Sequence, residues 1–88
     1  MSYKITYSKA FKKHYKKLSD TKKKQTKKRL KFFVENTTHP SLRTKKIQGT
    51  NWIWESSINM DIRIIFFYEN NEWIFLLDVG HHDILDKF

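Results

Sequence analysis

The stretch DIRIIFFYENNEWIFLLDVG, residues 61–80, decides the fold. Two apolar runs of strand length, 62–69 and 73–79, flank the pair Asn70-Asn71, and asparagine is typical of tight turns. A short turn between consecutive strands favours antiparallel pairing, so the stretch predicts a β-hairpin.

Two further strands precede this hairpin. The ranges 43–48 and 52–58 have strand patterns, and the turns are supplied by Gly49-Thr50-Asn51 and Asn59-Met60-Asp61. Together the four segments predict an antiparallel meander.

The N-terminal part of the chain predicts one strand and two helices. Residues 2–7 alternate between polar and apolar, which is typical of a strand. Residues 8–18 carry an apolar stripe at helical spacing, made of Phe11, His14, Tyr15 and Leu18. A second helix is predicted over 21–35, with Ser19 or Asp20 as its cap.

The predicted order is therefore β-α-α-β-β-β-β over residues 1–88. It is an α+β fold in which two N-terminal helices pack on one face of a small antiparallel sheet. With 88 residues and a mass of 10.8 kDa, the chain has room for one small domain. After the last strand, residues 82–88 form either a short helix or a loose end.

Charge is the most informative feature of the composition. The sequence has 18 Lys and Arg against 9 Asp and Glu, a net charge of +9. Residues 1–31 hold 13 basic side chains and a single acid, whereas residues 32–88 hold 5 bases and 8 acids. Such segregation indicates a polyanionic partner, which is RNA, DNA or an acidic protein; a solvated lysine-rich helix is the simpler alternative.

Composition also excludes several classes of protein. There is no cysteine, so the chain has no disulfide and no thiolate ligand or nucleophile. No apolar run approaches the length of a membrane span, and no signal-peptide core follows the first lysines, so a cytoplasmic location is expected. His81 and His82 have no further ligands at regular spacing, so no metal and no other cofactor is expected.

The alternation of the strands predicts which face of the sheet lies under the helices. One phase is almost wholly apolar and is predicted to face the helices: Trp52, Trp54, Ile62, Ile64, Phe66, Trp73, Phe75, Leu77 and Val79. The other phase is predicted to line an exposed or partly covered groove, and its polar members are Glu55, Ser57, Arg63 and Asp78. The two turns place Arg63 opposite Asp78 in one hairpin and opposite Ser57 in the other.

A rigid arginine in such a groove suits phosphodiester chemistry. Arg63 can bind non-bridging phosphate oxygens through its planar fork. His81 or His82, just after the last strand, can exchange a proton near neutral pH. The alternatives are that Arg63 only pairs with Asp78 across the strands, and that the two histidines are surface residues.

With these features in place, the sequence resembles the RelE/ParE toxin superfamily of bacterial type II toxin–antitoxin systems. The resemblance covers almost the whole chain. It rests on the element order, the lysine-rich helices and four segments: residues 42–49 (LRTKKIQG), Trp54-Glu55, residues 61–66 (DIRIIF) and residues 78–85 (DVGHHDIL).

The resemblance implies an mRNA interferase of the RelE type, a ribosome-dependent endoribonuclease that cuts mRNA in the ribosomal A site and so inhibits translation. In such enzymes the 2′-hydroxyl of the message is the nucleophile, and the products carry a 2′,3′-cyclic phosphate and a 5′-hydroxyl. The resemblance assigns Arg63 to the phosphate and His82 to proton transfer, with His81 in reserve. Glu55 is a possible base. The residues assigned to RNA binding are Lys45, Lys46, Lys23, Lys24, Lys27, Lys28 and Arg29.

The partners implied by the resemblance are a cognate acidic antitoxin, the ribosome and mRNA. DNA is reached only through the antitoxin complex, and no membrane is involved. Two alternatives stay open: the ParE branch shares the scaffold and inhibits DNA gyrase without cutting RNA, and a degenerate member would bind RNA without cleaving it. This chain departs from relatives that carry a lysine pair near residue 54, where it has Trp54-Glu55-Ser56.

Overall fold

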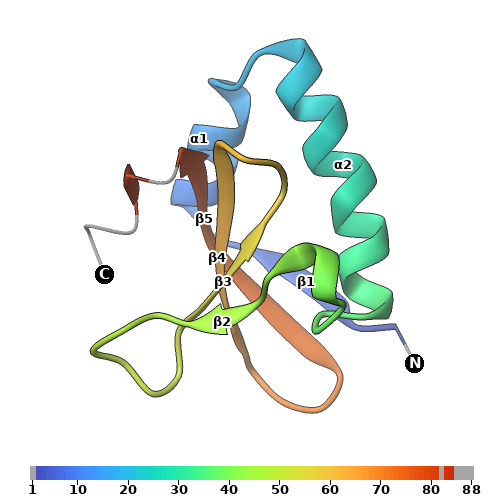
Figure 1. Cartoon of the computed structure of the whole chain (residues 1–88), viewed down its shortest axis with the longest axis vertical. Helices are drawn as coiled ribbons and strands as arrows, with labels where there is room; N and C mark the ends of the chain where they lie inside the picture. The colour runs from blue at the N-terminus through green and yellow to red at the C-terminus, as the bar shows by residue number, and fades with distance from the viewer. Residues whose placement is uncertain (1, 82, 85–88) are drawn as a thin grey trace.

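The computed structural model describes residues 2–81, 83 and 84 of the chain. The order of its elements is the predicted one, which confirms the α+β class (Figure 1). The elements are β1 (Lys4–Tyr7), α1 (Lys9–Lys16), α2 (Asp20–Glu35), the 3₁₀ turn η1 (Pro40–Leu42), β2 (Lys45–Lys46), β3 (Trp54–Ser57), β4 (Ile62–Tyr68) and β5 (Trp73–His81). The terminal helix considered for residues 82–88 lies largely outside the described residues.

The five strands of the described chain form one sheet in the order β1-β5-β4-β3-β2. The meander from β2 to β5 is antiparallel, as predicted. However, β1 pairs with β5 in parallel, with Lys4 opposite Trp73 and Tyr7 opposite Leu76. Parallel neighbours need a long connection, and both helices and the other strands lie between β1 and β5 in sequence. The prediction of a purely antiparallel sheet is therefore wrong at this pair.

Serine residues cap both helices. Ser8 Oγ accepts a hydrogen bond from the backbone N–H of Phe11 (2.9 Å), and Ser19 Oγ accepts one from Lys22 (3.3 Å). Ser19 is thus the cap of the second helix. The Ser8 hydroxyl also donates to the carbonyl of Leu77 (2.5 Å), which fastens the start of α1 to β5.

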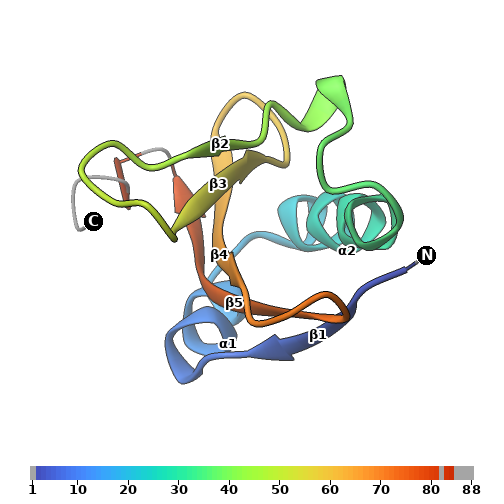
Figure 2. The same ribbon diagram turned by 90° about the horizontal axis from the view of Figure 1, so that it is seen from below.

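Both helices pack on the same face of the sheet, which we call the helix face. Phe11 of α1 and Leu30 and Phe33 of α2 share a buried cluster with the β4 and β5 residues Ile62, Ile64, Phe66, Ile74, Leu76 and Val79. Figure 2 shows α2 on one side of the twisted sheet and the loop between β2 and β3 on the other. We call that second side the outer face.

An irregularity in β5 reverses its alternation. Ile65 lies opposite Asp78 and Phe66 lies opposite Leu76, so β5 has one extra residue, Leu77. In a strand with such a bulge, the side chains before and after the extra residue no longer follow one alternation. As a result Leu76 faces the helices together with Val79, although they are three residues apart.

The predicted faces are therefore right for β4 and wrong for the first part of β5. Ile74 and Leu76 face the helices, and Trp73, Phe75 and Leu77 lie on the outer face. The prediction for Trp52 is also wrong: its side chain is 54% exposed and its ring packs against Phe67, 5.3 Å away between centroids.

The register of the last hairpin differs from the prediction by two residues. The turn accounts for one residue, since Tyr68 lies opposite Ile74, and the bulge accounts for the other. Arg63 is consequently opposite Gly80 and not Asp78. The predicted pairing of Arg63 with Ser57 across β3 and β4 is confirmed.

A chain of hydroxyl groups fastens η1 and β2 to the sheet. The Thr44 hydroxyl donates to the carbonyl of Thr37, and its oxygen lies 2.5 Å from Ser56 Oγ. Thr37 in turn hydrogen-bonds the hydroxyl of Tyr68 at 2.8 Å. Burial raises the pKa of Tyr68, so this hydroxyl keeps its proton at neutral pH. The network holds β2 in place at the edge of the sheet.

Gly80 leaves room for Ile84 to pack on the outer face. A Cβ atom on Gly80 would lie 2.7 Å from Cγ2 of Ile84, closer than two carbon atoms pack. Ile84 is buried and belongs to a small outer cluster with Ile47, Ile53, Ile65 and Leu77. This cluster covers the middle of the outer face.

Replacing Gly80 by alanine is expected to destabilise the protein by about 1–3 kcal/mol, because the added methyl group displaces Ile84. Urea unfolding of Gly80→Ala measures the loss. Ile84→Ala provides the matched background, since it removes the atom that clashes. If Gly80→Ala lowers the free energy of unfolding as much in that background as in the wild type, the contact with Ile84 is not the cause of the destabilisation.

Candidate functional site

Arg63 lies on the outer face because its neighbours Ile62 and Ile64 both face the helices. Its Nη1 donates to three backbone carbonyls at the turn between β3 and β4, those of Asn59 (2.8 Å), Met60 (3.1 Å) and Ile62 (3.3 Å). Among the described residues, its Nε and Nη2 have no hydrogen-bond partner. One side of the half-buried guanidinium is therefore fixed, and the other is available to a ligand.

The interpretation of Arg63 as one half of an ion pair with Asp78 is wrong. Asp78 is opposite Ile65, and its Oδ1 lies 2.6 Å from Nδ1 of His14 in α1. The same oxygen accepts the backbone N–H of Val79 at 2.8 Å. The pair ties α1 to the part of β5 that extends beyond β1. Sequence reasoning missed it, because His14 and Asp78 are 64 positions apart and only the fold brings them together.

His81, the second candidate for proton transfer, does not lie on the same face of the sheet as Arg63. His81 lies opposite Ile62 and ends β5 in an exposed position, where it lines a shallow cleft with His14 and Lys17. Arg63 lies opposite the residue before it, and successive side chains of a strand point to opposite faces. His81 and Arg63 are therefore on opposite faces of the sheet. His82, the first candidate for proton transfer, lies outside the described residues.

Glu55 shares the outer face with Arg63. Glu55 lies opposite Ile65 and Ser57 lies opposite Arg63, so Glu55 and Arg63 are diagonal neighbours across β3 and β4. Residues in such positions lie about 7–8 Å apart. Glu55 is only 7% exposed, and Lys45 lies opposite it on the other side.

The two lysines of β2 separate in the structure. Lys45 is opposite Glu55 and lies on the outer face. Lys46 is opposite Trp54 on the helix face, with its Nζ 5.4 Å from the centroid of the Trp54 ring. Only Lys45 therefore joins Arg63 and Glu55, and the outer-face site consists of these three residues.

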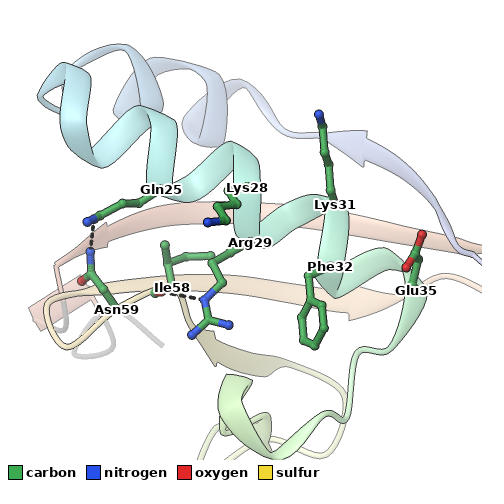
Figure 3. A pocket seen from close by; sticks show the side chains of 8 residues that line it. All are labelled: Gln25, Lys28, Arg29, Lys31, Phe32, Glu35, Ile58 and Asn59. Carbon is green, nitrogen blue, oxygen red and sulfur yellow. Dashed lines mark hydrogen bonds between the residues drawn. The ribbon is translucent and has the colours of Figure 1, made fainter.

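The basic residues of α2 divide between two grooves. Lys27 lines a trench of about 420 Å³ between α1 and α2, which we call the helix trench; the other lining residues are Tyr7, Phe11, Lys12, Tyr15, Lys16 and Leu30. Lys28 and Arg29 line a larger groove of about 600 Å³ between α2 and the β3–β4 turn (Figure 3). We call it the α2 groove; the other lining residues are Gln25, Lys31, Phe32, Glu35, Ile58 and Asn59. Lys23 and Lys24 lie one turn earlier on the helix.

The described residues bring no three His, Cys, Asp or Glu side chains close enough to hold a metal ion. Over the same residues, none of the helices has the length and apolar character needed to cross a membrane.

The order of the elements and the topology of the sheet define a RelE-like fold. The structure is similar to a chain of the Escherichia coli DinJ–YafQ toxin–antitoxin complex, with a TM-score of 0.76 at 18% identity over 97% of this chain and 98% of the other. For the E. coli RelBE toxin–antitoxin complex the TM-score is 0.72 at 20% identity, over 91% and 96%. For the archaeal RelE–RelB complex of Pyrococcus horikoshii it is 0.71 at 15% identity, over 92% and 96%.

The resemblance predicted from the sequence is thus confirmed for the fold, whose neighbours are RelE-type toxins. No protein-family model matches the sequence, and no curated protein matches it either.

Proposed function

We propose that this chain, as one RelE-like domain over residues 1–88, is the toxin of a type II toxin–antitoxin system and an mRNA interferase of the RelE type. The RelE-like fold supports the class of protein. One observation carries the activity: Arg63 is fixed on the outer face by Nη1, and none of the described residues hydrogen-bonds the rest of its guanidinium, which can bind a phosphate. The toxin works in the cytoplasm, on mRNA held by the ribosome.

The proposed reaction is attack by the 2′-oxygen of a nucleotide on its own 3′-phosphorus, with cleavage of the bond to the 5′-oxygen. The proton of the 2′-hydroxyl passes to a base and the leaving 5′-oxygen receives a proton, which gives a 2′,3′-cyclic phosphate and a 5′-hydroxyl. Arg63 binds the non-bridging oxygens and stabilises the charge that develops on them. Its contacts with the turn carbonyls hold it in position before the message arrives.

Glu55 is the proposed base, since it is a carboxylate diagonal to Arg63 on the outer face, and Asp78, in the equivalent position on β5, is paired with His14. His82 is the proposed acid, from the resemblance. His81 is the weaker candidate because it lies on the other face. The proposal includes no cofactor, because the substrate itself supplies the nucleophile.

The basic residues are proposed to bind the RNA backbone. Lys45 lies opposite Glu55 on the same face as Arg63, where it can bind a neighbouring phosphate of the RNA strand. Lys46 is on the other face and would bind elsewhere. The α2 residues Lys23, Lys24, Lys27, Lys28 and Arg29 would grip ribosomal RNA or more distant parts of the message.

Affinity for RNA is expected to fall about a hundredfold between 50 and 200 mM salt, if five basic residues of α2 each neutralise one phosphate of a single strand. Fluorescence anisotropy with a labelled oligoribonucleotide measures the slope of log affinity against log salt concentration. Lys24→Ala removes one exposed cation and should flatten the slope by about 0.7. A salt-independent affinity would contradict backbone binding by α2.

An acidic antitoxin is the proposed protein partner, because the similar toxins were solved in toxin–antitoxin complexes. The helix trench suits it. Apolar side chains such as Phe11 and Leu30 line the trench, and Lys12, Lys16 and Lys27 surround them. An acidic amphipathic segment would bury its apolar side there and neutralise the lysines. DNA binding is assigned to the antitoxin complex only.

Induced expression in growing cells tests the function against the alternatives. The proposal predicts that protein synthesis stops, that translated mRNAs are cut, and that DNA supercoiling is unchanged. Intact mRNA with a DNA-damage response would identify a ParE-like gyrase inhibitor, which the similarity to RelE and YafQ structures does not favour. Growth without arrest would identify a degenerate member of the superfamily.

A further inference from the structure

The α2 groove lies against the same turn that holds Arg63. Asn59 donates from Nδ2 to Oε1 of Gln25 (2.6 Å), and the carbonyl of Ile58 accepts from Nε of Arg29 (3.2 Å), as Figure 3 shows. On the other side of the turn, the carbonyl of Asn59 accepts from Arg63. A single strand of RNA that crosses this turn therefore reaches both the outer-face site and the α2 groove.

Phe32 presents an aromatic ring to this groove. It comes from the lysine-rich helix, its side chain is 36% exposed, and Figure 3 shows the ring directed into the groove. His39 packs against Phe32 at a steep angle of 77°, with 4.6 Å between the ring centroids. The ring is thus supported by a neighbour and still partly accessible, which is how proteins offer an aromatic side chain to an unstacked base.

Arg29 provides a second planar group, one turn before Phe32 on the same helix. Its Nε bonds the carbonyl of Ile58, and its Nη1 donates to Ser41 Oγ at 3.3 Å. These contacts fix the plane of the guanidinium, and arginine planes stack on bases as aromatic rings do.

The charges of the groove favour a polyanion. Three cations line it, Lys28, Arg29 and Lys31, against the single carboxylate of Glu35. The phosphates of a nucleotide can bind the lysines while its base contacts Phe32. An apolar protein segment would leave these cations without partners, so RNA is the occupant that the groove fits better.

We infer that the α2 groove binds one unstacked nucleotide of an RNA strand, with its base against Phe32 and Arg29 and its phosphates at Lys28 and Lys31. This inference rests on the proposed RNA-cutting function, and it adds a base-binding position on the helix side of the β3–β4 turn. Recognition of the base by stacking is sequence-tolerant, so the site holds the strand without selecting a sequence.

The test compares two fluorescent octamers of ribose phosphate in the absence of ribosomes, one with uracil bases and one without bases. The wild type should bind the uracil octamer more tightly. Phe32→Leu keeps an apolar side chain but removes the ring. It should weaken binding of the uracil octamer roughly tenfold and leave binding of the base-free octamer unchanged. Because no cation is lost, the salt dependence should not change.

Two matched variants complete the test. Phe32→Tyr keeps a ring and should bind within about twofold of the wild type. Tyr7→Leu removes a ring that is 42% exposed in the helix trench and should have no effect.

Equal wild-type affinity for the two octamers, or an unchanged affinity in Phe32→Leu, would overturn the inference. The inference would also be overturned if Phe32→Leu lost affinity for an acidic helical peptide and kept its affinity for RNA. The groove would then be assigned to a protein partner. Cleavage of translated mRNA by the wild type is scored separately, so the base-binding site can fail while the proposed function stands.

Discussion

Arg63→Ala is expected to lower the rate of mRNA cleavage by about 10²–10³-fold, the usual cost of removing one group that stabilises transition-state charge. The reason is geometric: Arg63 is fixed on the outer face, diagonal to Glu55, with Nη1 held by the turn, and no residue that the structure describes hydrogen-bonds its Nε or Nη2, which can bind the phosphate. Primer extension on a message translated in a reconstituted system measures the rate.

A structural effect of Arg63→Ala must be separated from a chemical one, since the side chain also holds the carbonyls of Asn59 and Met60. Arg63→Lys keeps the charge but not the planar fork, and should recover only part of the rate. Guanidinium ion added to Arg63→Ala should restore some cleavage. Lys9→Ala is the control: Lys9 is an exposed cation at the start of α1 with no assigned role in RNA binding, and the variant should cut as the wild type does. Equal rates for Arg63→Ala and Lys9→Ala would contradict the assignment.

Phe33→Ala is expected to destabilise the fold by about 3–5 kcal/mol, the range for truncating a buried aromatic residue. Phe33 has no exposed surface, and its ring meets Phe66 edge-on at 4.8 Å between centroids. Since native proteins have a total stability of about 5–15 kcal/mol, the variant should lose a large share of its free energy of unfolding. Urea unfolding followed by tryptophan fluorescence measures the loss.

The neighbouring Phe32→Ala is the matched control for Phe33→Ala. It removes the same number of atoms from the same helix, but Phe32 is 36% exposed and lies outside the buried cluster. Its cost should be below about 1 kcal/mol. Equal losses at the two positions would mean that α2 does not pack on the sheet as described.

The parts of the fold that depend on short-range patterns could be predicted from the sequence. The alternation in β4 placed Ile62, Ile64 and Phe66 under the helices, and the turn before β4 fixed the pairing of Ser57 with Arg63. Capping preferences likewise limited the cap of the second helix to Ser19 or Asp20, and Ser19 is the cap. Each of these features is decided within a few residues along the chain.

The features that failed depend on contacts made at long range. The parallel pairing of β1 with β5 joins the two ends of the chain, and no local pattern distinguishes it from an antiparallel edge. The bulge at Leu77 depends on how β5 pairs with β4 in the folded sheet, so alternation alone put Phe75 on the wrong face.

The candidate site was predictable to a similar extent. The alternation put Arg63 and Glu55 on one face, and in the structure the two residues are diagonal neighbours across β3 and β4. It could not show which of Lys45 and Lys46 lies on the outer face, since that depends on where β2 pairs with β3. The α2 groove was also missed, because it exists only where the β3–β4 turn approaches the helix.

The central claim is that the outer face promotes attack of a 2′-hydroxyl on the phosphate held by Arg63. Its most direct test is a translated message with a 2′-deoxynucleotide at the position that is cut in the all-ribose message. The account predicts that the all-ribose message yields a 2′,3′-cyclic phosphate and a 5′-hydroxyl, and that the 2′-deoxy message is not cut at that position. Continued cutting of the 2′-deoxy message, or a product with a 5′-phosphate, would contradict it.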